Sequence, residues 1–322
     1  MEDIIMKYGF GIDLGGTTVK LAYFDETGRM LHKWEIPTNT ADSGSHILPD
    51  IAKAILGYLE ENNIPREDII GLGMGVPGPV SRKGVVNRCI NLGWGVFNIH
   101  EALSQLTGFP VKAGNDANVA ALGECWKGGG QGCENMVMAT LGTGVGGGIV
   151  IDGKVLFGAH GSGGEIGHVI LDKNESNPCG CGNYGCVEQY CSATGIVRLA
   201  KRHLNRTKAP SSLRELEKLE CKDVFAAGAK GDEVALEILE DVYERLAEFL
   251  ADVCNVVDPE LVLIGGGVSK AGKPLVDGVS RHIGKYLFHA IAPLKFALAT
   301  LGNDAGAYGA FKLILDEAAG GR

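Results

Sequence analysis

Three cysteines and one histidine stand at a spacing that suits a metal ion. Cys179 and Cys181 flank one glycine, Cys186 lies five residues after Cys181, and His168 lies eleven residues before the first cysteine. Three thiolates and one imidazole form a closed tetrahedral Zn²⁺ site, and the intervening glycines allow the tight turns that such a site needs. The plainer alternative is that the four residues are three unrelated buried thiols and a surface histidine. That alternative explains the compact spacing of the cysteines poorly. We expect a structural zinc, because a closed site leaves no coordination position for a substrate.

Three carboxylates lie close to motifs that could do chemistry. Glu165 and Glu188 bracket the metal motif, so a bound zinc would hold both in place. Asp116 follows a short predicted strand, 111–113, and directly precedes a predicted helix, 117–126. An aspartate at that point can simply cap the helix. The helix dipole also favours the ionised carboxylate that a proton acceptor needs, and the residues alone leave both interpretations open.

Two turns rich in Gly and Thr have the composition of phosphate-binding turns, because their backbone N–H groups and hydroxyls can form a nest for an anion. An offset of 127 residues places Asp13-Leu14-Gly15-Gly16-Thr17 over Thr140-Leu141-Gly142-Thr143-Gly144, and Phe24-Asp25 over Ile151-Asp152. The offset indicates an internal repeat, in which each half contributes one hairpin to a shared cleft. Asp13, at the end of its strand, could hold Mg²⁺ through water, and a plain glycine-rich hairpin is the alternative.

A third glycine cluster, Gly265-Gly266-Gly267, follows an apolar strand predicted over 260–264. It allows either the close approach of a planar ligand or phosphate, or merely a tight turn into a helix, and the residues do not decide between them. Gly142-x-Gly144-x-x-Gly147 formally matches a dinucleotide fingerprint. It joins two apolar strands and opens no helix, so it does not predict a Rossmann fold.

The elements that must position these residues follow from apolar spacing. Strands are predicted over 8–13, up to 24, up to 36, 69–77, 136–156 in three pieces, 260–264 and 296–299. Helices are predicted over 47–62, 100–106, 117–126, 188–203, 232–257, 272–286 and 305–315. The last helix has small residues on one side, and we expect it to cross back to the first domain.

Composition narrows the classes of partner. The chain has 322 residues, a net charge of −9 and a pI of about 5.4, without a Lys/Arg block that would indicate nucleic acid. No apolar run is long enough to span a bilayer, and no signal peptide is recognisable. Nine cysteines with a metal motif fit a reducing cytoplasm, so the glycosylation pattern at Asn174-Glu175-Ser176 is interpreted as a chance match.

Five motifs occur in order: Asp13-Leu-Gly-Gly-Thr17, Asn115-Asp116-Ala-Asn118, Leu141-Gly-Thr-Gly-Val-Gly-Gly-Gly148, Gly164-Glu-Ile-Gly-His168 and Cys179-Gly-Cys-Gly-x-x-Gly-Cys-x-Glu188. The chain thereby resembles the ROK family (repressors, open reading frames, sugar kinases), and within it the bacterial glucokinases, over nearly its whole length. The resemblance implies an α/β fold of the duplicated actin-like ATPase (ribonuclease H-like) type, with two domains around a cleft. Residues 1–116 plus 301–322 would form the smaller domain, and 117–300 the larger one with the zinc motif and a dimerisation surface.

The resemblance also assigns roles to single residues. Asp116 matches the catalytic aspartate, the general base for the sugar 6-hydroxyl, and Gly114 departs from a glutamate found in many relatives. The sugar-contacting positions are Asn115, Glu165, His168 and Glu188, to which we add Gly78 and Asn91 from two neighbouring loops. The phosphate positions are Gly15, Gly16, Thr17 and Thr18 with Gly142, Thr143 and Gly144, and Asp13 is placed with them. The adenosine positions are Gly265 and Gly266. The zinc ligands are His168, Cys179, Cys181 and Cys186, with His168 facing zinc through one ring nitrogen and a sugar hydroxyl through the other.

The function implied is the ATP-dependent phosphorylation of D-glucose, giving glucose 6-phosphate and ADP, with catalytic Mg²⁺ and a homodimeric cytoplasmic enzyme. Kinases for N-acetylmannosamine, N-acetylglucosamine or fructose share the same motifs, and polyphosphate is an alternative donor to ATP. A sugar-responsive repressor or sensor is the hypothesis from another class. We expect it less, because family repressors carry an N-terminal DNA-binding module for which the residues before Asp13 leave no room.

Overall fold

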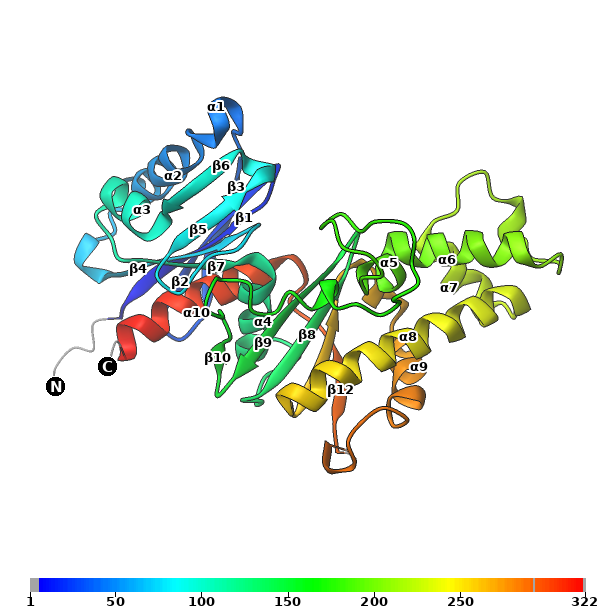
Figure 1. The fold of residues 1–322 in the computed structure, drawn as a ribbon. Helices are drawn as coiled ribbons and strands as arrows, with labels where there is room; N and C mark the ends of the chain where they lie inside the picture. The colour runs from blue at the N-terminus through cyan, green and yellow to red at the C-terminus, as the bar shows by residue number, and fades with distance from the viewer. Residues whose placement is uncertain (1–5, 292, 321–322) are drawn as a thin grey trace. The chain divides into compact units, whose positions relative to one another are not determined.

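The computed structural model describes residues 6–291 and 293–320 (Figure 1). The chain separates into two compact units. The first unit comprises Met1–Glu134, Gly148–Gly164 and Leu301–Arg322, and the second comprises Asn135–Gly147 and Glu165–Thr300. The two units are described in turn.

The first unit is built on a five-stranded sheet with helices on both faces (Figure 1). Its strands are β1 (Tyr8–Leu14), β2 (Thr18–Asp25), β3 (Met30–Pro37), β4 (Ile69–Val76) and β7 (Val111–Asn115), in the order β3-β2-β1-β4-β7. The first three strands are antiparallel to one another, and β4 and β7 continue the sheet parallel to β1. A short hairpin, β5 (Val85–Cys89) and β6 (Trp94–Asn98), lies outside this sheet.

Successive side chains of a strand point to opposite faces of the sheet, and different helices cover the two faces. The helices are α1 (Ala41–Gly44), α2 (Ile47–Glu61), α3 (Ile99–Thr107), α4 (Asp116–Lys127) and α10 (Ala305–Gly320). Phe10 and Ile12 of β1 pack in one core with the apolar stripe of α2. On the other face α10 lies directly against the sheet: a Cβ at Gly11 or Gly73 would come within 2.0 or 1.6 Å of an α10 carbonyl oxygen. The strand glycines therefore admit the helix, and α10 packs on α4 and β1. The prediction that the last helix crosses back to the first domain agrees with its place in the first unit.

A second five-stranded sheet repeats this plan in the order β10-β9-β8-β11-β12; β8, β11 and β12 belong to the second unit, and β10 belongs to the first. The strands are β8 (Met136–Leu141), β9 (Val145–Ile151), β10 (Lys154–Val155), β11 (Leu261–Gly265) and β12 (Lys295–Leu298), and the chain passes from the second unit to the first within β9. β8, β11 and β12 are parallel, as β1, β4 and β7 are in the first sheet. The two strand orders match position by position, which agrees with the predicted repeat. The predicted α/β class with two related sheets is confirmed.

The helices of the second unit are α5 (Glu188–Cys191), α6 (Ala193–Arg206), α7 (Cys221–Ala229), α8 (Glu233–Val257) and α9 (Lys273–Ile283). The prediction of one helix over 188–203 is wrong, because the chain breaks between α5 and α6. Ser192 has an extended backbone (φ −73°, ψ 166°), and its hydroxyl accepts the N–H of Gly195. A serine side chain competes with the helix in this way and starts a new one.

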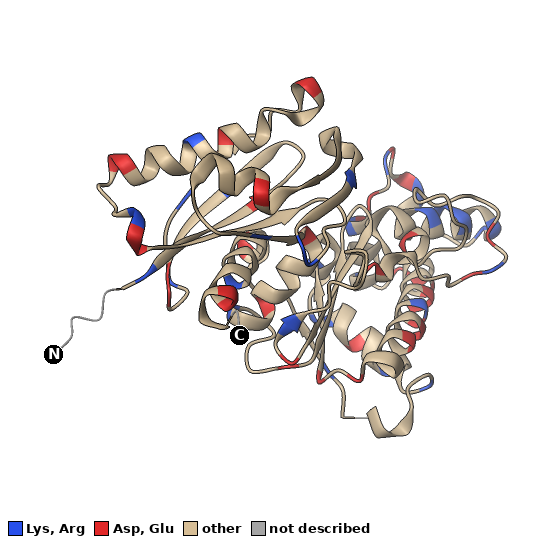
Figure 2. Ribbon diagram, turned by 60° about the vertical axis from the view of Figure 1, so that its left-hand side comes forward, with Lys and Arg blue, Asp and Glu red and all other residues tan. Residues whose placement is uncertain are grey.

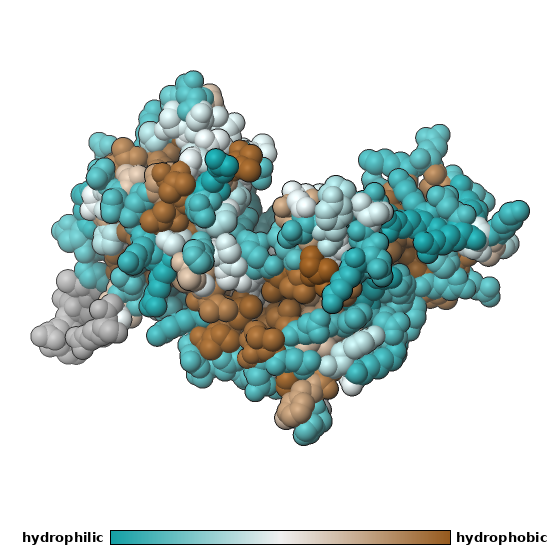
Figure 3. Space-filling model, in the orientation of Figure 1, coloured by the Kyte–Doolittle hydropathy of each residue, from teal (hydrophilic) through white to brown (hydrophobic). Residues whose placement is uncertain are grey.

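Surface chemistry is mixed over the described residues. Acidic residues lie along α8 and basic residues along α6 (Figure 2). On the face drawn in Figure 3, apolar residues gather in a patch at the lower centre and in smaller groups elsewhere, with polar residues around them. Within residues 6–291 and 293–320, no helix combines the length and the apolar composition needed to cross a membrane.

Candidate functional site

The predicted site residues divide between the two units. The first unit holds Asp13, Gly15, Gly16, Thr17, Thr18, Gly78, Asn91, Asn115 and Asp116. The second holds Gly142, Thr143, Gly144, Glu165, His168, Cys179, Cys181, Cys186, Glu188, Gly265 and Gly266.

The four predicted metal ligands converge in the second unit. One ligand atom from each of His168, Cys179, Cys181 and Cys186 lies within 4.8 Å of all the others. The Sγ atoms of Cys181 and Cys186 are 3.6 Å apart, and Cys179 Sγ lies 3.9 Å from His168 Nδ1. Tetrahedral zinc with Zn–S bonds of about 2.3 Å separates its sulfurs by about 3.8 Å, so this donor set fits Zn²⁺.

Backbone turns bring the ligands together. The N–H of Cys179 donates to the carbonyl of Asn183 at 2.7 Å, which closes the loop that carries Cys181. Gly185 has φ +75°, and a Cβ there would come within 1.8 Å of the Asp172 carbonyl oxygen, so only glycine fits. The preceding segment pairs with this loop through Ile170 and Cys186. The intervals between the three cysteines therefore match the tight turns of the loop that carries them.

Glu188 joins the metal cluster to the second Gly/Thr turn. It is the first residue of α5, and its Oε1 lies 3.5 Å from Cys179 Sγ. Its Oε2 accepts the N–H of Val145 at 3.0 Å. A Cβ at Gly144 would come within 2.2 Å of that oxygen, so a larger residue there would displace the Glu188 carboxylate. Glu165 is exposed at the start of the 3₁₀ turn Ile166–His168, and its carbonyl accepts the N–H of His168.

Gly265 and Gly266 end β11 beside the end of β8. Gly266 has φ +81°, and a Cβ there would meet the Leu141 carbonyl oxygen at 2.5 Å, so close packing alone explains this glycine. A cavity of about 410 Å³ begins at the next residue, Gly267. Its apolar lining includes Ala193, Phe225, Val268 and Ala271, with Lys222 and Lys270 beside them. A tight turn and room for a planar ligand therefore occur together.

The first Gly/Thr turn joins β1 to β2. The N–H of Gly15 donates to the carbonyl of Thr18 at 3.0 Å, and Gly16 and Thr17 are exposed. Asp13 Oδ2 accepts Lys20 Nζ at 2.9 Å, and both side chains are partly buried. The carboxylate of Asp13 is an oxygen donor of the type that Mg²⁺ prefers, and it lies within two residues of the turn.

Asn115, and not Asp116, is the cap of α4. The Asn115 Oδ1 accepts the N–H groups of Ala117 and Asn118 at 3.0 and 3.1 Å. Asp116 is the first helical residue, half-exposed, and its Oδ1 also accepts the N–H of Ala117 at 2.8 Å. Capping was the plainest explanation of Asp116. Because Asn115 is the N-cap of α4, that explanation does not account for Asp116.

The two loops singled out from the sequence lie in the same unit as Asp116. Asn115 Nδ2 donates to the carbonyl of Gly78 at 3.4 Å, so Gly78 is brought to the start of α4. The thiol of Cys89 donates to the Pro77 carbonyl at 2.8 Å. Burial raises the pKa of Cys89, with the nearby Asp116 charge contributing. Asn91 is exposed in the turn between β5 and β6.

Asn118 ends the Asn115-Asp116-Ala-Asn118 motif, and the sequence indicated no role for it. The structure shows which group its side chain binds. It is 2% exposed, and its Nδ2 donates to the carbonyl of Gly163 at 2.7 Å. Its Oδ1 is buried without a hydrogen-bond partner. Gly163 lies two residues before Glu165, so this amide fixes the segment that leads to a predicted sugar-contacting residue. A polar residue two positions after Asp116, in the first turn of a predicted helix, was the available signal.

A second group missed in the sequence is centred on Glu175, between the metal ligands His168 and Cys179. Its buried carboxylate accepts Arg202 through both terminal nitrogens at 2.9 and 3.0 Å, and Arg198 Nη1 lies at 3.0 Å. The hydroxyl of Tyr190 donates to it at 2.8 Å. The hydrogen bonds from Arg202 are foremost among the effects that hold the pKa of Glu175 well below its usual range, against the opposing effect of burial. This network ties the metal loop to α5 and α6.

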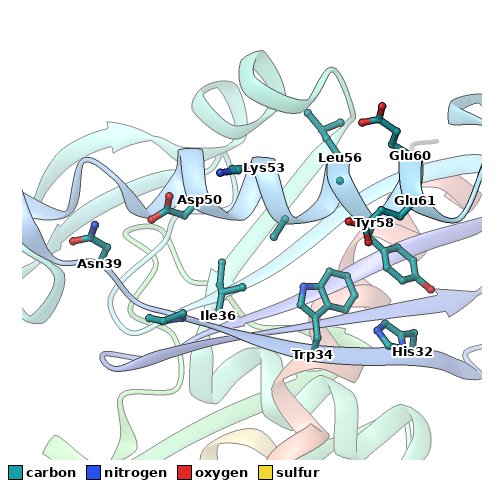
Figure 4. A pocket seen from close by; sticks show the side chains of 13 residues that line it. His32, Trp34, Ile36, Asn39, Asp50, Lys53, Leu56, Tyr58, Glu60 and Glu61 are labelled. Atoms are coloured by element: carbon teal, nitrogen blue, oxygen red, sulfur yellow. The ribbon is translucent and has the colours of Figure 1, made fainter.

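A wide groove in the first unit contains none of the predicted site residues. It has a volume of about 1280 Å³ and lies between β3 and α2 (Figure 4). Trp34 and Tyr58 stack at 4.9 Å between ring centroids, and His32 stacks on Tyr58 at 5.1 Å. The ring faces are thus occupied by one another, and size alone does not identify the site.

The chain is similar to known proteins along most of its length. A model of the ROK family matches residues 9–317. The glucokinase of Halalkalibacterium halodurans is 42% identical over 308 residues, which cover 94% of this chain and 93% of that protein. The structure of a ROK family glucokinase from Streptomyces griseus in complex with glucose and AMPPNP is 32% identical, with a TM-score of 0.71, over 96% of this chain and 98% of that chain.

Regulators of the family are also similar. A putative xylose repressor from Caldicellulosiruptor sp. is 28% identical over 281 residues, which cover 86% of this chain and 70% of the repressor. The family match extends over both units and includes the His/Cys cluster, both Gly/Thr turns and the Asn115-Asp116 pair. The protein belongs to the ROK family.

Proposed function

We propose that this protein is a glucokinase that transfers the γ-phosphoryl group of ATP to the 6-hydroxyl of D-glucose. The observation that carries the proposal is the start of α4, where Asn115 caps the helix and Asp116 keeps a half-exposed carboxylate in the first turn. The similarity to glucokinases over more than nine-tenths of the chain supports glucose as the acceptor.

Asp116 acts as the general base. Its carboxylate accepts the proton of the 6-hydroxyl while that oxygen forms a bond to the γ-phosphorus, and the bond from phosphorus to the β,γ-bridging oxygen of ATP breaks. The products are glucose 6-phosphate and ADP. The N-terminal end of the helix favours a negatively charged group at this position.

The remaining residues bind and orient. Glu165, His168, Glu188 and Asn115 accept or donate to sugar hydroxyls, and Gly78 and Asn91 lie in loops that select the hexose. Each unit supplies one phosphate-binding turn. Mg²⁺, when bound, would neutralise phosphate charge, and Asp13 is the residue that would hold it. The apolar cavity beside Gly267 would take the adenine ring, which favours ATP over polyphosphate as donor.

Zinc has a structural role in this proposal. His168, Cys179, Cys181 and Cys186 would hold it with all four positions filled, so it would shape the sugar-binding loop without entering the reaction.

A coupled assay of the purified protein tests the function. We expect turnover with glucose and ATP to exceed turnover with N-acetylglucosamine, N-acetylmannosamine or fructose, and ATP to exceed polyphosphate as donor. Asp116→Asn should lower kcat by about 10²–10⁴-fold, the usual contribution of a general base, with glucose affinity nearly unchanged by calorimetry. Asp42→Asn, at an exposed side chain of α1, is the matched control.

The assay also separates the alternatives. Retained activity in the Asp116→Asn variant would refute the assignment of the base. Sugar binding without any ATP turnover in the wild type would instead identify a sensor, as in the repressors of the family. The family resemblance further implies a homodimer, which light scattering of the purified protein tests.

A further inference from the structure

A threonine after β3 holds the first Gly/Thr turn from behind. Thr38 Oγ1 donates to the carbonyl of Gly15 at 2.7 Å, and the Thr38 N–H donates to the carbonyl of Thr17 at 2.9 Å. One residue outside the turn therefore fixes two of its peptide groups.

The second turn is held in a similar way by different elements. The Ala193 N–H donates to the carbonyl of Gly142 at 2.8 Å, and Thr194 Oγ1 donates to the carbonyl of Thr143 at 2.8 Å. Since the Thr194 proton goes to a carbonyl, the Ser192 hydroxyl, 3.0 Å away, must donate to Thr194. The break between α5 and α6 thus creates an anchor for the turn.

These anchors fix where the amides of the turns point. In a planar trans peptide the N–H points opposite to the carbonyl of the preceding residue. With the carbonyl of Gly15 held by Thr38, the N–H of Gly16 points away from the anchor. With the carbonyls of Gly142 and Thr143 held, the N–H groups of Thr143 and Gly144 do the same. Gly16 and Thr143 are exposed residues, so both turns lie at the surface, where a ligand can approach.

We propose that Thr38 and Thr194 are positioning residues that aim the amides of the two turns at the phosphates of the nucleotide. The inference rests on the proposed function, in which the turns bind ATP. Their anchoring roles do not follow from the sequence repeat, because an offset of 127 residues places Thr38 over Glu165. The two halves therefore reach the same arrangement through unrelated segments of chain.

Isosteric substitutions test the proposal. Thr38→Val and Thr194→Val remove the hydroxyl and keep the shape, whereas Thr38→Ser and Thr194→Ser keep the hydroxyl. Thr27→Val is the matched control, because Thr27 makes a 2.6 Å hydroxyl bond to Asp25 in a turn at the other end of β2. Calorimetry with AMPPNP, tripolyphosphate, adenosine and glucose separates phosphate recognition from the rest, and thermal melting confirms folding.

We expect each valine variant to weaken AMPPNP and tripolyphosphate binding about three- to tenfold, the usual effect of one lost hydrogen bond, with adenosine and glucose affinity unchanged. The serine variants and Thr27→Val should bind within about twofold of the wild type. Valine variants with wild-type AMPPNP affinity would overturn the inference, and so would an equal loss of adenosine affinity. If a valine variant fails to fold, loss of AMPPNP affinity in the serine variants would also overturn it.

The outcomes distinguish the inference from the function on which it rests. A wild type that binds AMPPNP but phosphorylates no hexose would refute the kinase proposal, and the valine variants would still test the anchors. A wild type that binds neither AMPPNP nor tripolyphosphate would overturn both.

Discussion

Replacement of Glu175 by Gln should destabilise the second unit and loosen its metal loop. The carboxylate is 2% exposed at the side chain and accepts bonds from Arg202, Arg198, Tyr190 and the backbone N–H of Asn177 at 2.8 to 3.0 Å. Glutamine has the same size, but its NH₂ group would face guanidinium donors and its charge is gone.

The expected loss in the free energy of unfolding is about 3 kcal/mol. Breaking a buried ion pair costs about 3–5 kcal/mol. The lower end applies here because Arg198 and Arg202 remain 26% and 35% exposed at the side chain, so water satisfies part of what they lose. Glu237→Gln is the matched control: this exposed carboxylate pairs with His203, and its loss should cost less than about 0.5 kcal/mol.

The pH dependence gives a second measure of the same interaction. The folded-state pKa of Glu175 lies below its ordinary value of 4.5, so its contribution is fully present above that value. It is lost as the pH falls toward the folded-state pKa. The difference between wild type and Glu175→Gln should therefore be constant from pH 6 to 8 and shrink below about pH 4.

Urea unfolding followed by circular dichroism gives these free energies, and a chromogenic chelator gives the rate of zinc loss at pH 7. We expect zinc to leave the Glu175→Gln variant faster, because residue 175 lies in the loop between His168 and Cys179. A loss of under 1 kcal/mol at pH 7, or a difference that persists unchanged at pH 3, would refute the reasoning.

Three further predictions concern the metal, the start of α4 and the strand that precedes it. Cys181→Ala, or zinc removal by chelation, should lower glucose affinity and melting temperature together; a zinc-free protein with both values intact would disprove the structural role. Asn118→Asp removes the donor to the Gly163 carbonyl at constant size, so it should raise KM for glucose about tenfold and kcat should change less. Steady-state kinetics against an Asn62→Asp control checks this, and an unchanged KM would count against it. Burial lowers the pKa of His100 to about 4 from 6.5, and its Nε2 accepts the Ala113 N–H at 2.9 Å. The unfolded chain then binds the proton more readily, so stability should fall from pH 6.5 to 4, and less steeply in His100→Gln, as urea titrations at each pH would show.

Much of the fold could be predicted because the apolar pattern of most elements agrees with the secondary structure that they form. The apolar stripe of α2 and the short strands around the Gly/Thr turns have the periodicity of the structures that they form. The repeat was visible because its turns use the same residue types at the same spacing. The one merged helix, over 188–203, shows the limit of periodicity. Apolar spacing continues through Ser192, and only the conformation of that serine ends α5 and starts α6.

The candidate site was predictable to the extent that its parts are adjacent in the chain. Asp116 stood out by its place at a helix start, but the sequence did not show that Asn115 takes the capping bonds. Glu175 was noticed only within a glycosylation pattern, because its arginine partner lies 27 residues away. A carboxylate in a loop has no sequence feature that distinguishes an exposed charge from a buried one.

The sequence by itself therefore indicated the His/Cys cluster, the two turns and the class of fold, since each depends on residue types that lie near one another in the chain. The tertiary structure alone decided which distant groups support them. Asn118 reaches Gly163 across 45 residues, Thr38 reaches Gly15 across 23, and Thr194 reaches Thr143 across 51. Such partners are chosen by the packing of whole elements, which brings one of many hydroxyls or amides to a carbonyl. The spacing of residues along the chain does not show which distant group will become the partner.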